Sequence, residues 1–142
     1  MCVRFKHFPE FGVTLNVYSG TLTSDVMMRW VDRLEPVEWT RWINYLDPKL
    51  DLSGWDIAHF AAVRRALAAK LTELHGDAHL DSALVSASPA HEFFLRFWPS
   101  SVGRDVHYPT KPVAFTSLEG ACKWLGLPEG ALTVLAEAAS SL

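Results

Sequence analysis

The chain has 142 residues, of which 49% are hydrophobic and 20% charged, so it is long enough to bury a core and too apolar to be disordered. Its net charge of −3 gives no support to a basic surface for nucleic acid. No apolar run reaches the length of a membrane span and no hydrophobic leader is present, so we expect one cytoplasmic domain over residues 1–142 without a membrane segment.

The chain opens with two alternating segments, residues 3–8 and 13–18, which predict an antiparallel hairpin around the turn-forming residues 9–12. In the second segment the apolar residues share one face, and the polar face that includes Asn16 is expected to be partly wet. Thr23 is suited to cap the helix that follows, and the proline at position 36 cannot continue it.

The central unit begins with an alternating segment from Trp39 to Leu46 that predicts a strand. An Asp-rich turn follows, in which Ser53 stands three residues before Asp56, the spacing of a helix-capping box. The long amphipathic helix behind this turn is expected to end at Gly76.

A further strand is predicted in the apolar residues 80–88, and Ser88 with Pro89 can begin the next helix. We expect that helix to end before a loop at residues 99–103. The last strand, within Val106–Phe115, contains two prolines and is therefore expected at a sheet edge.

Two short helices close the chain. Thr116 with Glu119 has capping-box spacing, and Pro128 can begin the last helix. Cys122 falls on the apolar side of the first and is expected to be buried, and it forms no metal-binding or disulfide motif with Cys2. The predicted fold is α/β, a single-domain mixed sheet of about five strands with an N-terminal hairpin and β-α repeats, covered by helices that are expected chiefly on one face.

Three segments, GTLTSDVMMRWVDRL, LDLSGWDIAHFAAVRRAL and VAFTSLEGACKWLGL, follow the hairpin in an order that resembles the STAS-like superfamily. They are most similar to bacterial SpoIIAA-like proteins, whose fold is related to Sec14-type lipid-binding domains. The resemblance covers the chain up to Gly126 and implies a non-enzymatic regulatory or protein-interaction module without a cofactor.

The resemblance also implies a regulatory site. In the anti-sigma-factor antagonists of this superfamily, a partner kinase phosphorylates a serine of a D-S-S-G turn. The matching residues here are Asp51, Leu52, Ser53 and Gly54, so Leu52 stands at the phosphorylated position. Ser53, with Asp51 and Gly54, is therefore a regulatory candidate, although we favour a helix-capping role for Ser53.

Two groups of polar residues have the composition of a chemical site, and each has a simpler interpretation. Residues 75–81, HGDAHLD, contain metal-ligand types at loose spacing, and we expect solvated turn residues and no metal. Ser86 or Ser88 with His91 could form a hydrolytic site, but no G-x-S-x-G elbow is present.

Aromatic residues are numerous, with six Trp and eight Phe. Those that could line an interface or a ligand pocket are Trp30, Trp55, Phe93, Phe94, Phe97 and Trp98. We rank a core role first, a homodimer or partner surface second, and a small-ligand pocket third. The main functional hypothesis is a STAS-like interaction module that binds another protein or itself. The alternatives are a carrier or sensor of an apolar small molecule or lipid and, ranked last, a small Ser/His hydrolase.

Overall fold

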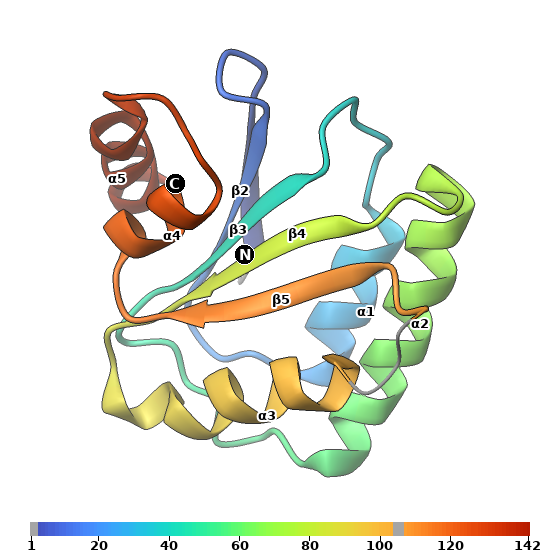
Figure 1. Cartoon of the computed structure of the whole chain (residues 1–142). Coiled ribbons are helices and arrows are strands. Elements are labelled where there is room, and N and C mark those ends of the chain that lie inside the picture. The colour runs from blue at the N-terminus through green and yellow to red at the C-terminus, as the bar shows by residue number, and fades with distance from the viewer. Residues whose placement is uncertain (1–2, 104–106) are drawn as a thin grey trace.

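A mixed sheet forms the centre of the computed structural model, which describes residues 3–103 and 107–142 (Figure 1). Its strand order is β1-β2-β3-β4-β5. The strands are β1 (Val3–Phe8), β2 (Val13–Tyr18), β3 (Arg41–Leu46), β4 (Leu80–Val85) and β5 (Thr110–Phe115). β1 pairs with β2 in antiparallel fashion, and the other neighbours are parallel. The predicted α/β class and its N-terminal hairpin are confirmed.

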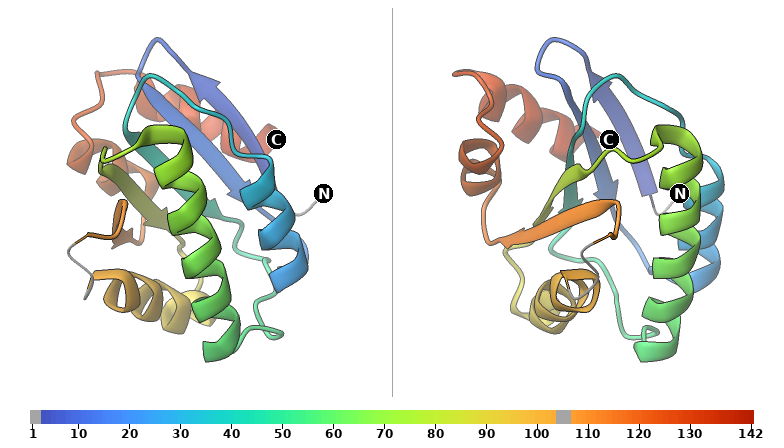
Figure 2. Two further views of the ribbon diagram at one scale, coloured as in Figure 1. Left: turned by 90° about the vertical axis from the view of Figure 1, so that its right-hand side faces the viewer. Right: turned by 45° about the vertical axis from the view of Figure 1, so that its right-hand side comes forward.

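Helices cover both faces of this sheet, with more of them on one face than on the other (Figure 2). They are α1 (Ser24–Asp32), α2 (Ile57–His75), the 3₁₀ turn η1 (Pro89–His91) leading into α3 (Glu92–Gly103), α4 (Leu118–Trp124) and α5 (Ala131–Ser141). The parallel strands follow one another in sequence order, so right-handed crossovers place α1, α2 and α3 on the same face. α4 and α5 come after the last strand and pack on the opposite face.

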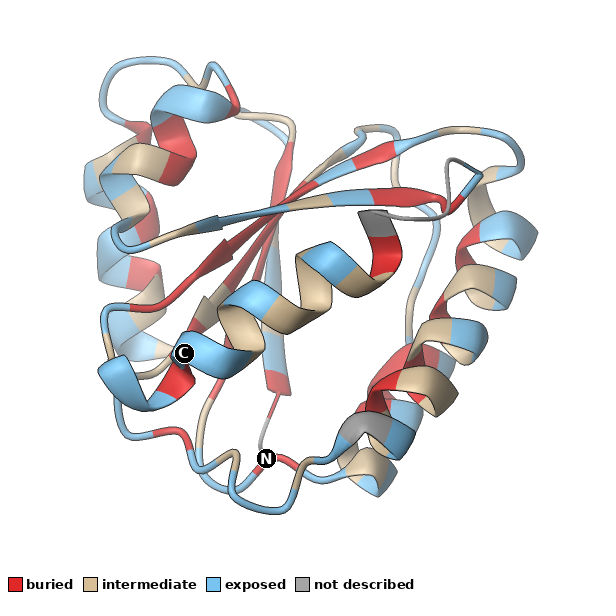
Figure 3. Cartoon of the chain, turned by 60° about the horizontal axis from the view of Figure 1, so that its bottom comes forward, coloured by how far each residue is buried: buried red, intermediate tan, exposed pale blue. Residues whose placement is uncertain are grey.

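Two hydrophobic cores result, one on each side of the sheet. The core beneath α1, α2 and α3 includes Trp30 and Leu67, and the core beneath α4 and α5 includes Ile43, Cys122 and Leu135. Buried residues are accordingly concentrated on the central strands and on the inner sides of the helices (Figure 3). Cys122 is buried and free, as the sequence predicts.

Arg41 joins the hairpin to the α4–α5 layer. Its guanidinium donates hydrogen bonds to the carbonyl oxygens of Phe11 at 2.7 Å, Gly12 at 3.2 Å and Leu125 at 3.0 Å. Leu125 is the C-cap residue of α4, where a positive charge also complements the helix dipole. This one side chain therefore holds the turn of the hairpin against the end of a helix that lies far away in the sequence.

Two helix caps differ from their predicted residues. Asp56 caps α2, because its Oδ1 accepts from His59 N at 3.0 Å while His59 Nδ1 accepts from Asp56 N at 3.2 Å. The predicted cap, Ser53, lies one turn earlier and takes no part. Ser117 caps α4 by accepting from Gly120 N at 3.1 Å, so the prediction of its neighbour Thr116 is also wrong. In both cases two good capping residues stand close together, and the one nearer the helix is used.

Two helix boundaries near prolines also differ from the prediction. α3 continues through Pro99 to Gly103, where we expected a loop. Proline removes one backbone hydrogen bond there, but Val102 in the following turn is 1% exposed, and its packing favours continuation. The last helix begins at Ala131 rather than at Pro128, after Gly130 adopts a φ of +90°.

β5 lies at the edge of the sheet, as its prolines predict. Val106, the predicted start of this strand, and Cys2 lie outside the described residues. Within residues 3–103 and 107–142, no helix is long and apolar enough to cross a bilayer.

Candidate functional site

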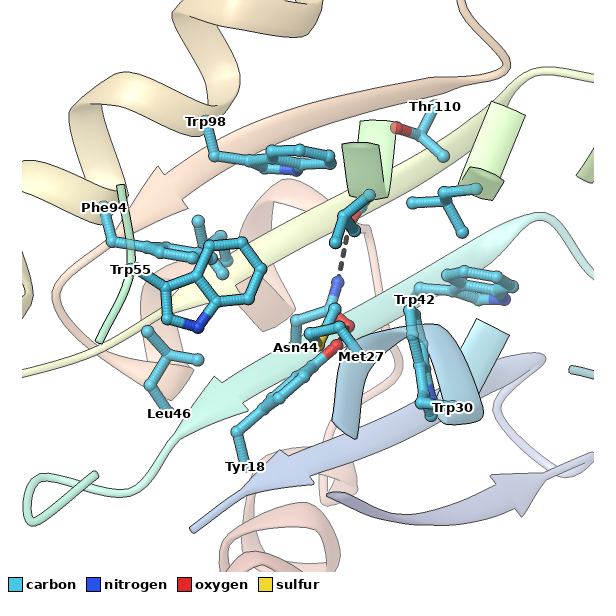
Figure 4. A pocket seen from close by; sticks show the side chains of 14 residues that line it. Tyr18, Met27, Trp30, Trp42, Asn44, Leu46, Trp55, Phe94, Trp98 and Thr110 are labelled. Atoms are coloured by element: carbon cyan, nitrogen blue, oxygen red, sulfur yellow. Dashed lines mark hydrogen bonds between the residues drawn. The ribbon is translucent and has the colours of Figure 1, made fainter. Parts of the chain in front are cut away.

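A cavity of about 40 Å³ lies between the sheet and helices α1, α2 and α3 (Figure 4). Its walls are mostly aromatic or aliphatic, and its floor on the sheet is polar. The lining residues are Tyr18, Met27, Trp30, Trp42, Asn44, Leu46, Trp55, Val63, Leu67, Ser82, Leu84, Phe94, Trp98 and Thr110. Four of the six sequence-predicted aromatic candidates, Trp30, Trp55, Phe94 and Trp98, thus meet at one place.

The polar floor is organised around Asn44, in the middle of β3. Its side-chain oxygen accepts hydrogen bonds from Asn16 Nδ2 at 3.0 Å and from the Tyr18 hydroxyl at 3.1 Å. Its amide nitrogen donates to Ser82 Oγ at 2.7 Å, the bond drawn as a dashed line in Figure 4. The polar face of β2, which we expected to be partly wet, is instead buried beneath the helices, where Asn16 and Tyr18 both bond to Asn44 of the neighbouring strand.

Several hydrogen-bond donors of the residues that line this cavity have no partner within the described residues. The indole nitrogens of Trp30, Trp42 and Trp55 are buried and have no partner within the described residues. Thr110 is only 5% exposed, and its hydroxyl makes no hydrogen bond to any described residue. Ser82 Oγ accepts from the Asn44 amide, which leaves the hydroxyl hydrogen of Ser82 available.

The Asp51–Gly54 turn is held on both sides by backbone hydrogen bonds. Asp51 N donates to the Gly20 carbonyl at 2.8 Å, and the Asp51 carbonyl accepts from Leu22 N at 3.0 Å. The carboxylate of Asp51 accepts from Ser53 N at 2.9 Å. Hydrogen bonds from the side chain and the backbone of Ser53 lower the pKa of Asp51 from its ordinary value. Ser53 therefore serves this turn and not the helix, and the favoured capping role is wrong.

An open groove of about 290 Å³ separates this turn from η1 and the start of α3. We call it the turn groove, and it is lined by Leu50, Asp51, Leu52, Ser53, Trp55, Phe60, Ala90, His91, Phe93 and Phe94. It brings the regulatory candidates Asp51 and Ser53 together with three of the aromatic candidates, and Gly54 is exposed in the same turn. Phe93 and Phe94 are far from this turn in the sequence, and their meeting with it could not be predicted from the sequence.

A second open groove, of about 520 Å³, runs between α2 and α3. We call it the α2–α3 groove, and it is lined by Arg64, Phe93, Arg96, Phe97, Ser100 and Ser101. Phe93 lies between the two grooves and is 57% exposed. The ring of Phe97 stacks on Phe93 at a centroid distance of 5.3 Å.

The aromatic residues of α3 share one buried partner on α2. Phe60 is 2% exposed, and its ring centroid lies 4.8 to 6.4 Å from those of four α3 residues and 5.1 Å from that of Trp55. The four α3 partners are Phe93, Phe94, Phe97 and Trp98. Phe60 thus fixes the helix that separates the cavity from the two grooves.

Ser86 and His91 do form a hydrogen-bonded pair, with 2.6 Å between Ser86 Oγ and His91 Nδ1. The second ring nitrogen, Nε2, lies 2.8 Å from the Leu50 carbonyl oxygen, which can only accept. Nε2 therefore carries a hydrogen, and in the neutral ring Nδ1 accepts the hydroxyl of Ser86. Both residues are 1% exposed, so this chain of bonds links β4, η1 and the Leu50 loop and presents no free nucleophile. Ser88 caps η1, as predicted.

The HGDAHLD segment joins α2 to β4. Within the described residues, no three His, Cys, Asp or Glu side chains are grouped as a metal site would require. His75 is half-buried, and its Nε2 has no partner among those residues. Burial lowers the pKa of His75 from its ordinary value of 6.5, because the charged imidazolium loses hydration.

This shift in the pKa of His75 predicts a pH-dependent loss of stability. Below pH 6.5 the unfolded chain binds a proton at this residue more readily than the folded chain does. A stabilising contribution that is fully present above pH 6.5 is therefore lost as the pH falls through the folded-state pKa. Urea unfolding between about pH 8 and about pH 5 should show wild type losing more stability than His75→Gln. A difference between the two proteins that stays constant with pH would contradict the assignment.

A scan against protein-family models finds no match for this chain, and a search of curated proteins finds none either. The family resemblance therefore depends on the sequence motifs and on the fold. The five-stranded mixed sheet, with its N-terminal hairpin and β-α units, is compatible with a STAS-like fold.

Proposed function

We propose that this chain is a non-enzymatic, STAS-like regulatory module that binds a partner protein at the turn groove. The observation that carries the proposal is Phe93, which is 57% exposed at the border of two grooves. Large aromatic side chains in such positions act as anchors in protein interfaces, because covering them removes much apolar area from water. The partner this surface suits presents an apolar side chain that enters the turn groove beside Phe93.

The turn groove is already shaped for binding. Backbone hydrogen bonds with Gly20 and Leu22 hold Asp51, and the His91 ring holds the carbonyl of Leu50. A surface that keeps its shape before association loses less conformational entropy when a partner binds. The rigidity of this loop therefore supports a recognition role.

Ser53 is the natural regulatory element of this surface. It is exposed at the rim of the groove, and its modification would leave the cap of α2 intact because Asp56 performs that role. A phosphate at Ser53 would add negative charge beside the Asp51 carboxylate and would remove the hydrogen bond from the Ser53 hydroxyl to it. Such a change would alter the charge and shape of the groove at once.

The two alternative functions have different support. The hydrolase alternative has less support, because Ser86 is only 1% exposed and the Ser88 side chain serves as the cap of η1. The small-molecule alternative retains the cavity, but its volume of about 40 Å³ is far below the roughly 300–1,000 Å³ of pockets for larger ligands. A lipid would therefore require α3 to move.

Site-specific photo-crosslinking in the producing cells tests the proposal. With p-benzoylphenylalanine in place of Phe93, we expect one discrete protein adduct after irradiation, identifiable by mass spectrometry. The same replacement at Trp124, an aromatic residue that is 40% exposed on the opposite helical layer, is the matched control and should not give that adduct. Identical products at both positions, or no adduct at position 93, would refute the proposal.

The same adduct also tests the role of Ser53. We expect Ser53→Glu to lower its yield several-fold, because a second carboxylate is placed beside Asp51. Ser53→Ala should leave the yield nearly unchanged, since the Ser53 backbone N–H still bonds to Asp51. An adduct that consists of two copies of this chain would identify a homodimer as the partner complex. Equal yields for Ser53→Glu and wild type would remove Ser53 from the proposed site.

A further inference from the structure

The cavity beneath α1, α2 and α3 contains polar groups without a partner among the described residues, and these groups have no role in the proposed partner-binding surface. The Asn44 side-chain oxygen already accepts from Asn16 and Tyr18, whereas the buried indole nitrogens of Trp30, Trp42 and Trp55, which can only donate, have no partner among the described residues. Figure 4 shows the Thr110 oxygen on the side of this residue that faces Trp98. The Thr110 hydroxyl has no hydrogen-bond partner among the described residues, and the residue is more than nine-tenths buried.

Charge and size narrow the class of molecule further. None of the 14 described lining side chains is charged, so nothing there would compensate a buried anion or cation. The walls are aromatic and aliphatic, which suits an apolar body. The volume of about 40 Å³ admits roughly one to three water-sized groups.

An entry route lies at the border with the turn groove. Trp55 and Phe94 line both the cavity and the turn groove, and both are only half-buried. Their rings meet edge to face at a centroid distance of 6.0 Å. A rotation of these two side chains would open the cavity while α2 and α3 stay folded.

From these observations we infer that the cavity is a binding site for a small, neutral molecule with an apolar body and a carbonyl-type acceptor. The acceptor oxygen is bound by the hydroxyl groups of Thr110 and Ser82. The apolar part contacts Trp98 and Phe94. This inference stands apart from the partner-binding proposal, since neither Phe93 nor Ser53 takes part in it.

An isosteric set of probes tests the inference, namely acetone, isobutene and acetate. We expect acetone to shift the indole N–H resonances of the cavity tryptophans in a saturable manner in proton–nitrogen NMR spectra. Isobutene has the same shape without an acceptor and should bind at least about fivefold more weakly, the equivalent of one lost hydrogen bond. Acetate carries a charge that the cavity cannot compensate and should give no saturable shift.

Isosteric variants identify the donors. Thr110→Val and Ser82→Ala should each lower the affinity for acetone by about fivefold. Thr133→Val makes the same chemical change on the exposed side of α5 and should have no effect. The remaining resonances of each spectrum report whether the variant is folded. Equal binding of isobutene and acetone, tighter binding of acetate, or no saturable shift with any probe would overturn the inference.

Discussion

Replacing Phe60 by alanine is expected to lower the free energy of unfolding by about 3–5 kcal/mol. The side chain is 2% exposed and lies at the centre of the aromatic cluster that joins α2 to α3. Its removal would leave a ring-sized cavity that the surrounding rings cannot fill, because they are themselves attached to two different helices. Urea unfolding followed by circular dichroism measures the change.

Phe93→Ala is the matched control for this prediction. Phe93 belongs to the same cluster, with its ring centroid 6.4 Å from that of Phe60, but more than half of it is exposed to solvent. We expect this variant to cost less than about 1 kcal/mol, because little buried area is lost. Equal losses for the two variants would show that the cluster does not have Phe60 at its centre.

Asn44→Ala is expected to lower the free energy of unfolding by about 2–4 kcal/mol, although only a few atoms are removed. The substitution leaves buried polar groups on Asn16, Tyr18 and Ser82 without the partner that they have in the folded chain. Buried donors and acceptors that lose their hydrogen bonds cost more than the bonds themselves contribute.

A double-mutant cycle separates this network effect from simple loss of volume. Ser82→Ala alone should cost about 1 kcal/mol, since Asn44 keeps its two other hydrogen bonds. In the variant with both substitutions, the total loss should be smaller than the sum by about 1 kcal/mol, because the bond between them is counted only once. Additive losses of unfolding free energy would show that Asn44 and Ser82 are not energetically coupled.

Local patterns were sufficient to predict the strands and most of the helices. Alternation fixed the hairpin strands because a turn of suitable composition separates them. The choice between Ser53 and Asp56 as the cap of α2 was not predictable in this way, since both residue types are good caps. Ser53 belongs to the preceding turn through the Asx-type hydrogen bond from its N–H to Asp51, so Asp56 is the residue that caps α2. This Asx-type bond depends on how the loop is anchored to Gly20.

Features that depend on contacts between distant parts of the chain could not be predicted from the sequence patterns. The alternation in β2 shows two faces, but it does not show that α1 and α2 cover the polar one. The pairing of Ser86 with His91 is short-range and was a named candidate, whereas the Leu50 carbonyl that completes it is a backbone group with no sequence signature. The cavity required three helices and four strands to be placed before it could be recognised.

The pair of rings formed by Trp55 and Phe94 has a thermodynamic consequence. These two side chains are a common wall of the cavity and the turn groove. A molecule that binds in the cavity and favours one orientation of these two rings changes the free energy of partner binding. Linkage is reciprocal, so a partner whose affinity rises by a given factor must raise the affinity of the cavity molecule by that factor. Binding of the protein partner would then change the affinity of the cavity for its ligand, just as the ligand would change the affinity for the partner.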